Sequence, residues 1–176
     1  MELPARVHAL LQAREETVAT AESLTGGRLA ALLTGVPGAS RSYVGGVVAY
    51  ATSVKEELLG VSPALVEQYG VISSECALAM ARGAAAVTGA SWGVGTTGVA
   101  GPELQEGQPA GTVHVGLVGP GVATALALEL VGGREAIQDR TCAEALSALA
   151  GMLEGSAGTN AGIDAGKNRP SGSVEP

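Results

Sequence analysis

The fold is decided by the stretch Thr17-Val-Ala-Thr-Ala-Glu-Ser-Leu-Thr-Gly-Gly27, which runs into Arg28-Leu-Ala-Ala-Leu-Leu33. Residues 17–20 are a short β-type run, and the residues that follow, up to the glycine pair, form a tight turn. The segment after the turn has the composition of a helix, which Gly35 and Pro37 end. A strand, a turn and a helix in this order predict an α/β unit.

The rest of the chain continues this alternation. Two β-rich runs near the C-terminal end are joined by Gly119-Pro120-Gly121, which predicts a hairpin. Strands that alternate with helices, together with one hairpin, predict an α/β protein: a three-layer α/β/α sandwich with a mixed β-sheet. We expect helices near residues 3–11, 28–33, 52–59, 63–70, 74–87 and 133–152, and strands near residues 17–20, 43–50, 92–99, 111–118 and 122–131.

The composition changes after Glu154. Residues 155–176 are mostly Gly, Ala, Ser, Asn and Pro. Such a segment buries too little apolar surface to offset the entropy lost on ordering. We therefore expect one folded domain over residues 1–154, followed by a flexible tail over residues 155–176.

The overall composition narrows the functional class. The 10 Lys and Arg against 17 Asp and Glu give a net charge of −7, and aromatic residues are 2% of the chain, with no Phe. A basic surface and base-stacking rings are therefore scarce, which excludes a general nucleic-acid binder. The sequence also shows no signal peptide and no apolar run of membrane-spanning length, so we expect a cytoplasmic protein that binds no membrane. Cys76 and Cys142 are interpreted as small buried thiols.

Two familiar kinds of site are not supported. Gly93-Val-Gly95-Thr-Thr-Gly98 matches the dinucleotide pattern G-x-G-x-x-G, but it lies inside a strand and a polar loop follows it instead of a helix. His8 and His114 have no acids or cysteines near them at metal-ligand spacing. We therefore predict no metal site and no cofactor, and we interpret the histidines as structural or exposed.

Ser23 is the first candidate for chemistry, because it lies where the first strand turns into a helix. The backbone N–H groups of a helix start are free, and here Thr25, Gly26 and Gly27 would offer theirs to an oxyanion or a phosphate. Ser23 would then be a nucleophile. The competing interpretation is a simple helix N-cap, which position alone favours.

Lys55 shifts the balance toward chemistry. It is the only Lys besides Lys167 and lies five residues after Tyr50, where a strand turns into a helix. A desolvated Lys has a lowered pKa and can act as general base for a Ser. Tyr50 can donate a hydrogen bond or relay a proton. The alternatives are a solvated Lys on a helix face and a Tyr that only packs.

Other polar residues are candidates for substrate contact. Thr97 lies at the end of a strand, where ligands bind in open α/β sheets, although a Thr in a strand also fits a purely structural role. Arg134 and Arg140 lie on the last helix and can hold a phosphate or a carboxylate, and surface placement is the alternative for both.

Three motifs carry a resemblance to a known family: Thr20-Ala-Glu-Ser23-Leu-Thr-Gly-Gly27, Gly46-Val-Val-Ala-Tyr50 with Lys55, and Gly98-Val-Ala-Gly-Pro102 with Pro109-Ala-Gly-Thr-Val113. Over about residues 3–153 the chain resembles the C-terminal amidohydrolase domain of the CinA (competence/damage-inducible) family. The resemblance implies hydrolysis of the carboxamide of nicotinamide mononucleotide to nicotinate mononucleotide and ammonia, in pyridine-nucleotide recycling. It also implies a stand-alone form without the amino-terminal domain of many CinA proteins.

The resemblance implies roles for individual residues. The family's catalytic Ser, Tyr and Lys fall on Ser23, Tyr50 and Lys55, and its hydroxyl position before G-x-A-G-P falls on Thr97. Ser23 would attack the amide while Lys55, directly or through Tyr50, moves the proton, and water would then hydrolyse the acyl-enzyme. The residues expected to bind substrate are Thr25, Gly26, Gly27, Thr97, Gly98, Ala100, Gly101, Arg134 and Arg140.

The chain departs from the family pattern at three places. Leu24 stands where the family usually has Cys. The loop Glu103-Leu-Gln-Glu-Gly-Gln108 lacks the usual Gly-Gly and Lys, and Gln138 replaces an Arg on the last helix. The last two changes weaken the expected recognition of a phosphate. A catalytically silent domain that binds a nucleotide or a partner is therefore the competing hypothesis. A homo-oligomer is also expected, because Gly- and Ala-rich helices pack closely.

Overall fold

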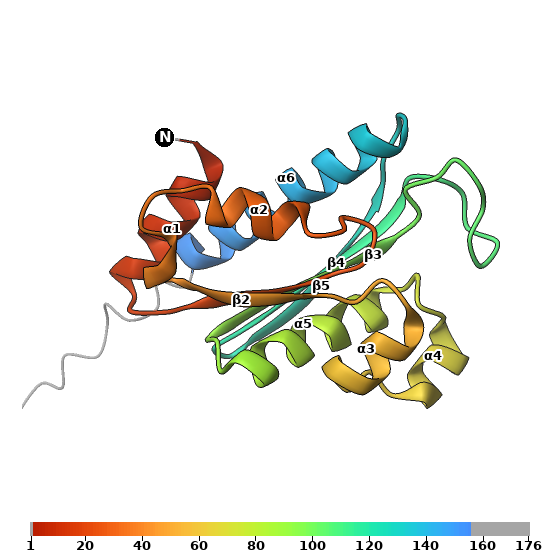
Figure 1. Ribbon diagram of the computed structural model, residues 1–176, viewed down its shortest axis with the longest axis horizontal. Coiled ribbons are helices and arrows are strands. Elements are labelled where there is room, and N and C mark those ends of the chain that lie inside the picture. Colours follow the sequence, from red (N-terminus) through yellow and green to blue (C-terminus); the bar gives the residue numbers. More distant parts are fainter. Residues whose placement is uncertain (1, 156–176) are drawn as a thin grey trace, which may run out of the picture.

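The computed structural model describes residues 2–155, so the predicted tail lies outside the described residues apart from Gly155. Helices cover both faces of a twisted sheet (Figure 1). The elements in chain order are α1 (Leu3–Ala13), β1 (Val18–Glu22), α2 (Arg28–Thr34), the 3₁₀ turn η1 (Ala39–Arg41), β2 (Tyr43–Val48), α3 (Thr52–Leu59), α4 (Pro63–Tyr69), α5 (Ser74–Thr88), β3 (Trp92–Gly98), β4 (Thr112–Gly119), β5 (Val122–Glu129) and α6 (Arg134–Gly155).

The five strands form one mixed sheet in the order β2-β1-β3-β4-β5. β1 pairs in parallel with β2 and with β3, whereas β3, β4 and β5 are antiparallel to one another. The predicted hairpin is confirmed, and it joins β4 to β5. The predicted three-layer α/β/α sandwich with a mixed sheet is confirmed as well.

Each face of the sheet has its own core. One cluster joins α1, α2 and α6 to the sheet through large side chains that include Leu11, Leu29, Trp92 and Leu149. The other lies under α3, α4 and α5 and consists mainly of small and aliphatic residues such as Met80. Both clusters contain apolar residues of β1, and every residue of β1 is buried because helices cover it on both sides.

The glycines of the dinucleotide-like pattern have a packing role. A Cβ atom on Gly93 would lie 1.9 Å from the carbonyl oxygen of Ala81, and one on Gly95 would lie 2.3 Å from that of Ala77. Both carbonyls belong to α5, so the glycines let this helix lie directly on the sheet. A loop follows β3, and the prediction that this pattern does not start a nucleotide-binding helix is confirmed.

Two strand boundaries differ from the prediction. β1 extends to Glu22, beyond the predicted end at residue 20, and β2 ends at Val48, short of the predicted residue 50.

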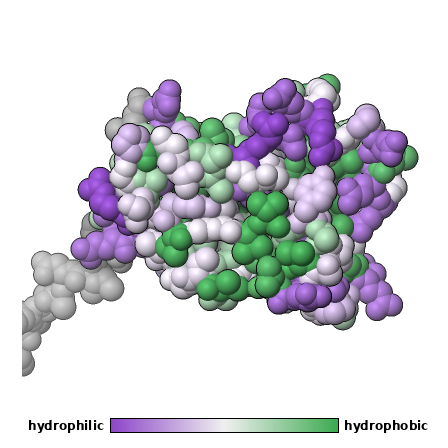
Figure 2. All heavy atoms as spheres, viewed as in Figure 1, coloured by the Kyte–Doolittle hydropathy of each residue, from purple (hydrophilic) through white to green (hydrophobic). Residues whose placement is uncertain are grey.

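β2 forms an outer edge of the sheet, and Val44 and Val48 are about half-exposed on it. Apolar side chains gather around this edge on the face shown in Figure 2. The expected homo-oligomer stays a prediction.

Candidate active site

A cavity of about 270 Å³ lies beyond the carboxyl ends of the parallel strands. Ser23 follows β1 and Tyr50 follows β2, while residues 98–105 run from the last residue of β3 into a long loop that projects from the sheet (Figure 1). Arg134, at the start of α6, completes the wall. The carboxyl ends of parallel strands meet at one sheet edge, which is where open α/β sheets bind their ligands.

Ser23 and Lys55 meet at this cavity. The Nζ of Lys55 donates a hydrogen bond of 3.1 Å to the Oγ of Ser23. It also donates to the carbonyl oxygens of Ala49 at 2.8 Å and Tyr50 at 3.3 Å. The two residues meet because Ser23 follows β1, whereas Lys55 lies on α3, the helix that comes after the neighbouring strand β2. A nucleophile and a base in hydrogen-bond contact are the minimum set for covalent catalysis.

The environment of Lys55 favours its neutral form. Its side chain is only 1% exposed, and no carboxylate in residues 2–155 forms a salt bridge with it. Burial lowers the pKa of Lys55, while the charge of Glu106 opposes part of that effect. A buried amine with a lowered pKa can accept a proton near neutral pH. The solvated-face interpretation of this Lys was wrong.

The expected free N–H groups at the start of α2 are already bonded. The buried carboxylate of Glu22 accepts hydrogen bonds from the N–H groups of Gly27 at 2.9 Å, Leu29 at 3.0 Å and Ala30 at 2.8 Å. The N–H of Gly26 donates to the carbonyl of Ser23. An anion of the protein itself thus caps this helix, and the prediction that the N–H groups of Gly26 and Gly27 hold an oxyanion or phosphate was wrong.

The turn still offers donors one step closer to Ser23. Within residues 2–155, the N–H groups of Leu24 and Thr25 have no protein acceptor. Thr25 is fully buried, and its side chain does not reach the cavity because its hydroxyl pairs with that of Thr96 at 2.8 Å. Buried N–H groups without an acceptor are rare, so these two are the better candidates for binding an oxyanion beside Ser23.

Tyr50 and Arg134 form a bridge at the mouth of the cavity. The guanidinium of Arg134 donates to the hydroxyl of Tyr50 at 2.9 Å and to the carbonyl of Gly101 at 3.0 Å. The Tyr50 hydroxyl therefore faces Arg134. Lys55 donates a hydrogen bond to the backbone carbonyl of Tyr50 and not to its hydroxyl. Both partners of Arg134 are neutral, so its positive charge remains available to an anion. Gly98 and Ala100 line the same cavity.

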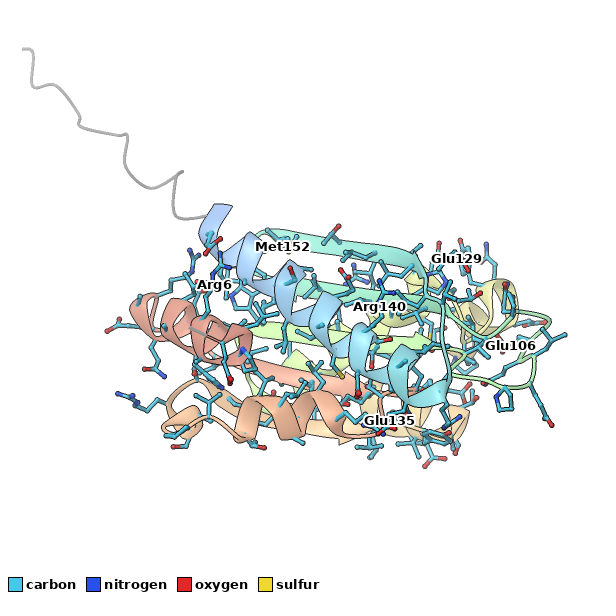
Figure 3. All side chains as sticks on the ribbon, turned by 90° about the horizontal axis from the view of Figure 1, so that it is seen from above. Arg6, Glu106, Glu129, Glu135, Arg140 and Met152 are labelled. Atoms are coloured by element: carbon cyan, nitrogen blue, oxygen red, sulfur yellow. The ribbon has the colours of Figure 1, made fainter. Side chains whose placement is uncertain are left out.

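Two expected contact residues lie elsewhere. Thr97 is buried, and its hydroxyl donates at 2.6 Å to the carbonyl of Val71, on the side of the sheet covered by α5. Arg140 is exposed in the first half of α6 (Figure 3). It follows Arg134 by six residues, and at about 100° per residue the two side chains leave the helix in different directions. Neither residue lines the cavity, so their expected contact with substrate is not supported.

Several structural roles were missed from the sequence. Gln138 is buried and donates at 2.7 Å to the carbonyl of Leu24, so it supports the turn that holds Ser23. Glu106, in the loop after β3, accepts hydrogen bonds from Val71 and Ile72. Glu22 carried the one available signal, which is an acid directly before a helix start at the end of an otherwise apolar strand.

No group of three or more metal-ligating side chains occurs in the part of the chain that the structure describes. No helix within it is long and apolar enough to cross a bilayer.

His8 is buried and bonded to Ser42 and to the carbonyl of Leu33, so the structural interpretation of this residue is confirmed. Cys76 and Cys142 are free, buried thiols, as predicted.

Comparison with known proteins gives one family throughout. The model of the CinA C-terminal domain matches residues 1–153. A CinA-like protein of Anaeromyxobacter sp. strain Fw109-5 is 51% identical over 149 residues, which are 84% of this chain and 36% of the relative. A CinA-like protein of Frankia casuarinae is 47% identical over 146 residues, or 83% of this chain and 34% of the relative. The chain thus spans about a third of the length of these relatives.

Solved structures agree with this result. The competence damage-inducible protein A of Klebsiella pneumoniae is 33% identical, with a TM-score of 0.84 over 86% of this chain and 95% of the other. The competence/damage-inducible protein of Agrobacterium tumefaciens is 32% identical, with a TM-score of 0.82 over 86% and 93% of the two chains. Since the family model covers nearly all of the described residues, the chain belongs to the CinA C-terminal domain family.

Proposed function

We propose that this protein is a serine-type amidohydrolase that converts nicotinamide mononucleotide to nicotinate mononucleotide and ammonia. The observation that carries the proposal is the 3.1 Å hydrogen bond between the buried Lys55 and Ser23 at the cavity. Lys55 is buried beside a hydroxyl and two carbonyls, and no carboxylate in residues 2–155 forms a salt bridge with it, so its charged form is costly there. A buried amine of this kind, in contact with a hydroxyl, suits general-base chemistry.

The reaction follows from this pair. In the reacting state the neutral amine of Lys55 keeps its two N–H donors on the carbonyls of Ala49 and Tyr50, and the Ser23 hydroxyl donates to its lone pair. Lys55 then takes the proton of Ser23 as Oγ attacks the carboxamide carbon. The proton then passes to the amide nitrogen, the C–N bond breaks, and ammonia leaves an ester on Ser23. Water attacks the ester, Lys55 accepts a proton from it, and the acid departs as Ser23 regains its hydrogen. Lys55 is the direct base in this scheme, because the Tyr50 hydroxyl is bonded to Arg134.

Two further features support the proposed reaction. The free N–H groups of Leu24 and Thr25 belong to the turn of Ser23 and can stabilise negative charge on the carbonyl oxygen. Arg134 lies at the mouth of the cavity with its charge uncompensated, and there it can receive the phosphate of a mononucleotide. The bridge from Tyr50 fixes its direction. Its place on the rim suits a phosphate that stays near solvent while the ring enters the cavity.

The test is ammonia release from nicotinamide mononucleotide by the purified protein and its variants. Ser23→Ala is expected to lose activity by about a thousandfold or more. Lys55→Met is expected to lose about 10²–10⁴-fold, the usual contribution of a general base. Lys55→Arg is expected to be equally impaired, because a guanidinium stays protonated. Ser62→Ala is the matched control, since Ser62 is exposed directly before α4, does not line the cavity and makes no side-chain cap hydrogen bond.

Activity in Ser23→Ala within tenfold of wild type would refute the proposed nucleophile. A folded wild type that releases no ammonia from this nucleotide or from related pyridine amides would refute the amidohydrolase. That result would favour the silent binding domain, whose ligand binding is then measured by calorimetry with both mononucleotides.

A further inference from the structure

Within the described residues, the side-chain hydrogen bonds between the loop that lines the cavity and the α4–α5 connection all come from one residue, Glu106. Both carboxylate oxygens of Glu106 accept from the N–H of Val71, at 3.0 and 3.2 Å, and one accepts from Ile72 at 3.1 Å. Glu106 lies at the loop end labelled in Figure 3, 34 and 35 residues away from its two partners in sequence. The cavity wall and the α4–α5 connection are therefore held together by a carboxylate.

The loop is built to present this carboxylate. Gln105 and Gln108 exchange backbone hydrogen bonds of 3.1 and 2.9 Å, which closes a turn with Glu106 and Gly107 at its centre. Both central residues have positive φ, at 51° and 74°. This is the backbone pattern of a type I′ turn. Glu106 is its first central residue, and the positive φ required there is unfavourable for a residue with a Cβ atom. The surrounding contacts hold Glu106 in a conformation that its own backbone does not prefer.

The receiving segment is equally adapted. A Cβ atom on Gly70 would lie 2.6 Å from the Oε2 of Glu106, so only glycine leaves room for the carboxylate there. The peptide that joins Val71 to Ile72 is bonded at both ends, since its carbonyl accepts from Thr97 and its N–H donates to Glu106. Hydrogen bonds in such a series strengthen one another. The expected substrate residue Thr97 thus acts on the same peptide as the loop.

We infer that Glu106 is a positioning residue: it latches the loop of residues 103–110 onto the α4–α5 connection and so fixes the wall of the cavity over Ser23. The latched wall comprises Glu103, Leu104 and Gln105. The Glu106 carboxylate also lies near enough to Lys55 to favour its charged form. The inference on turnover rests on the proposed function, but the latch itself does not.

The latch is tested first without substrate. Amide hydrogen exchange of Val71 and Ile72 is measured by NMR in the full-length wild type, in Glu106→Ala and in Glu67→Gln. Glu67 is an exposed carboxylate on α4, so its variant controls for the loss of one negative charge. We expect Glu106→Ala to exchange both amides about tenfold faster or more, the effect of a lost hydrogen bond to a charged group. Unchanged exchange at both amides would overturn the latch.

Turnover then separates positioning from general stability. In Glu106→Ala we expect KM for the nucleotide to rise about tenfold while kcat changes less, because the wall and not the Ser23–Lys55 pair is disturbed. Glu106→Gln keeps one acceptor oxygen but loses the charge. It should restore most of KM, and the acidic limb of its pH profile should move to lower pH, since Lys55 loses a favourable neighbour. If kcat fell by the same factor as KM rose, and did so in both variants, the positioning role would be refuted. Inactivity of the wild type would refute only the proposed function.

Discussion

Replacing Glu22 by Gln is expected to lower the free energy of unfolding by about 2–4 kcal/mol. The Glu22 side chain is 1% exposed and its carboxylate accepts three N–H bonds of 2.8 to 3.0 Å at the start of α2. Oε2 receives Gly27 and Leu29, and Oε1 receives Ala30. The amide of Gln has a single acceptor oxygen, so it can keep the two bonds at Oε2 but must turn an NH₂ group toward the N–H of Ala30.

The magnitude follows from these contacts. A hydrogen bond to an ionised group contributes about 1.5–3 kcal/mol and a neutral one about 0.5–1.5 kcal/mol. Two bonds therefore weaken by about 1 kcal/mol each and the third is lost. The lower cost of burying a neutral group offsets part of the sum. For a chain of this size the change corresponds to a fall in Tm of about 6–12 °C.

The measurement is urea and thermal unfolding followed by circular dichroism at neutral pH, with Glu57→Gln as control. Glu57 is exposed on α3, and its replacement should change the free energy of unfolding by less than about 0.5 kcal/mol. If Glu22→Gln were as stable as this control, the carboxylate would not cap α2. The N–H groups of the glycine turn would then be available to a ligand after all.

Two further predictions concern the buried amine and the helix that lies on the sheet. Because burial lowers the pKa of folded Lys55, the unfolded chain binds more protons between that lowered pKa and about 10.4. The free energy of unfolding of wild type should therefore rise with pH across this window relative to that of Lys55→Met. The measurement is urea unfolding of both proteins at several pH values. If the amine were solvated, the difference between their free energies of unfolding would not change with pH. Gly95→Ala should cost about 3 kcal/mol or more, because its Cβ would lie 2.3 Å from the carbonyl of Ala77 and α5 would have to move. Gly45→Ala on β2 is the control, with its nearest atom at 4.0 Å, and equal Tm values for the two variants would contradict direct contact of helix and sheet.

Much of the fold was predictable because its signals are local. Glycine and proline mark the ends of the helices and the hairpin, and the apolar patterns between them distinguish helices from strands. The boundary errors at β1 and β2 are of one or two residues, where pairing with neighbouring strands decides which residues stay extended. Strand order and the parallel arrangement of β1 with β3 come from contacts that no local pattern records.

The candidate site was predictable only in part. Six of the predicted residues line one cavity: Ser23, Tyr50, Gly98, Ala100, Gly101 and Arg134. Lys55 does not line it but is hydrogen-bonded to Ser23. Thr97 was misplaced because alternate residues of a strand face opposite sides of the sheet, and its side is set by the helix that covers it. The N–H groups of the glycine turn were expected to be free because the sequence shows Glu22 only as the last residue of a strand. Its contact with the start of α2 appears only in the tertiary structure, where its carboxylate accepts from the N–H groups there.

The sequence by itself determined the kind and order of the elements, the family, and the presence of Lys55 after a strand and of Ser23 in a turn. Only the tertiary structure decided that these two residues are partners. They are 32 residues apart in sequence, and they meet because β2 lies beside β1 with the same direction. The same holds for Glu106 and Val71, which are 35 residues apart. Side-chain pairs of this kind depend on how layers pack, and the free energy that fixes the packing comes from burial of the whole core rather than from the residues of the site.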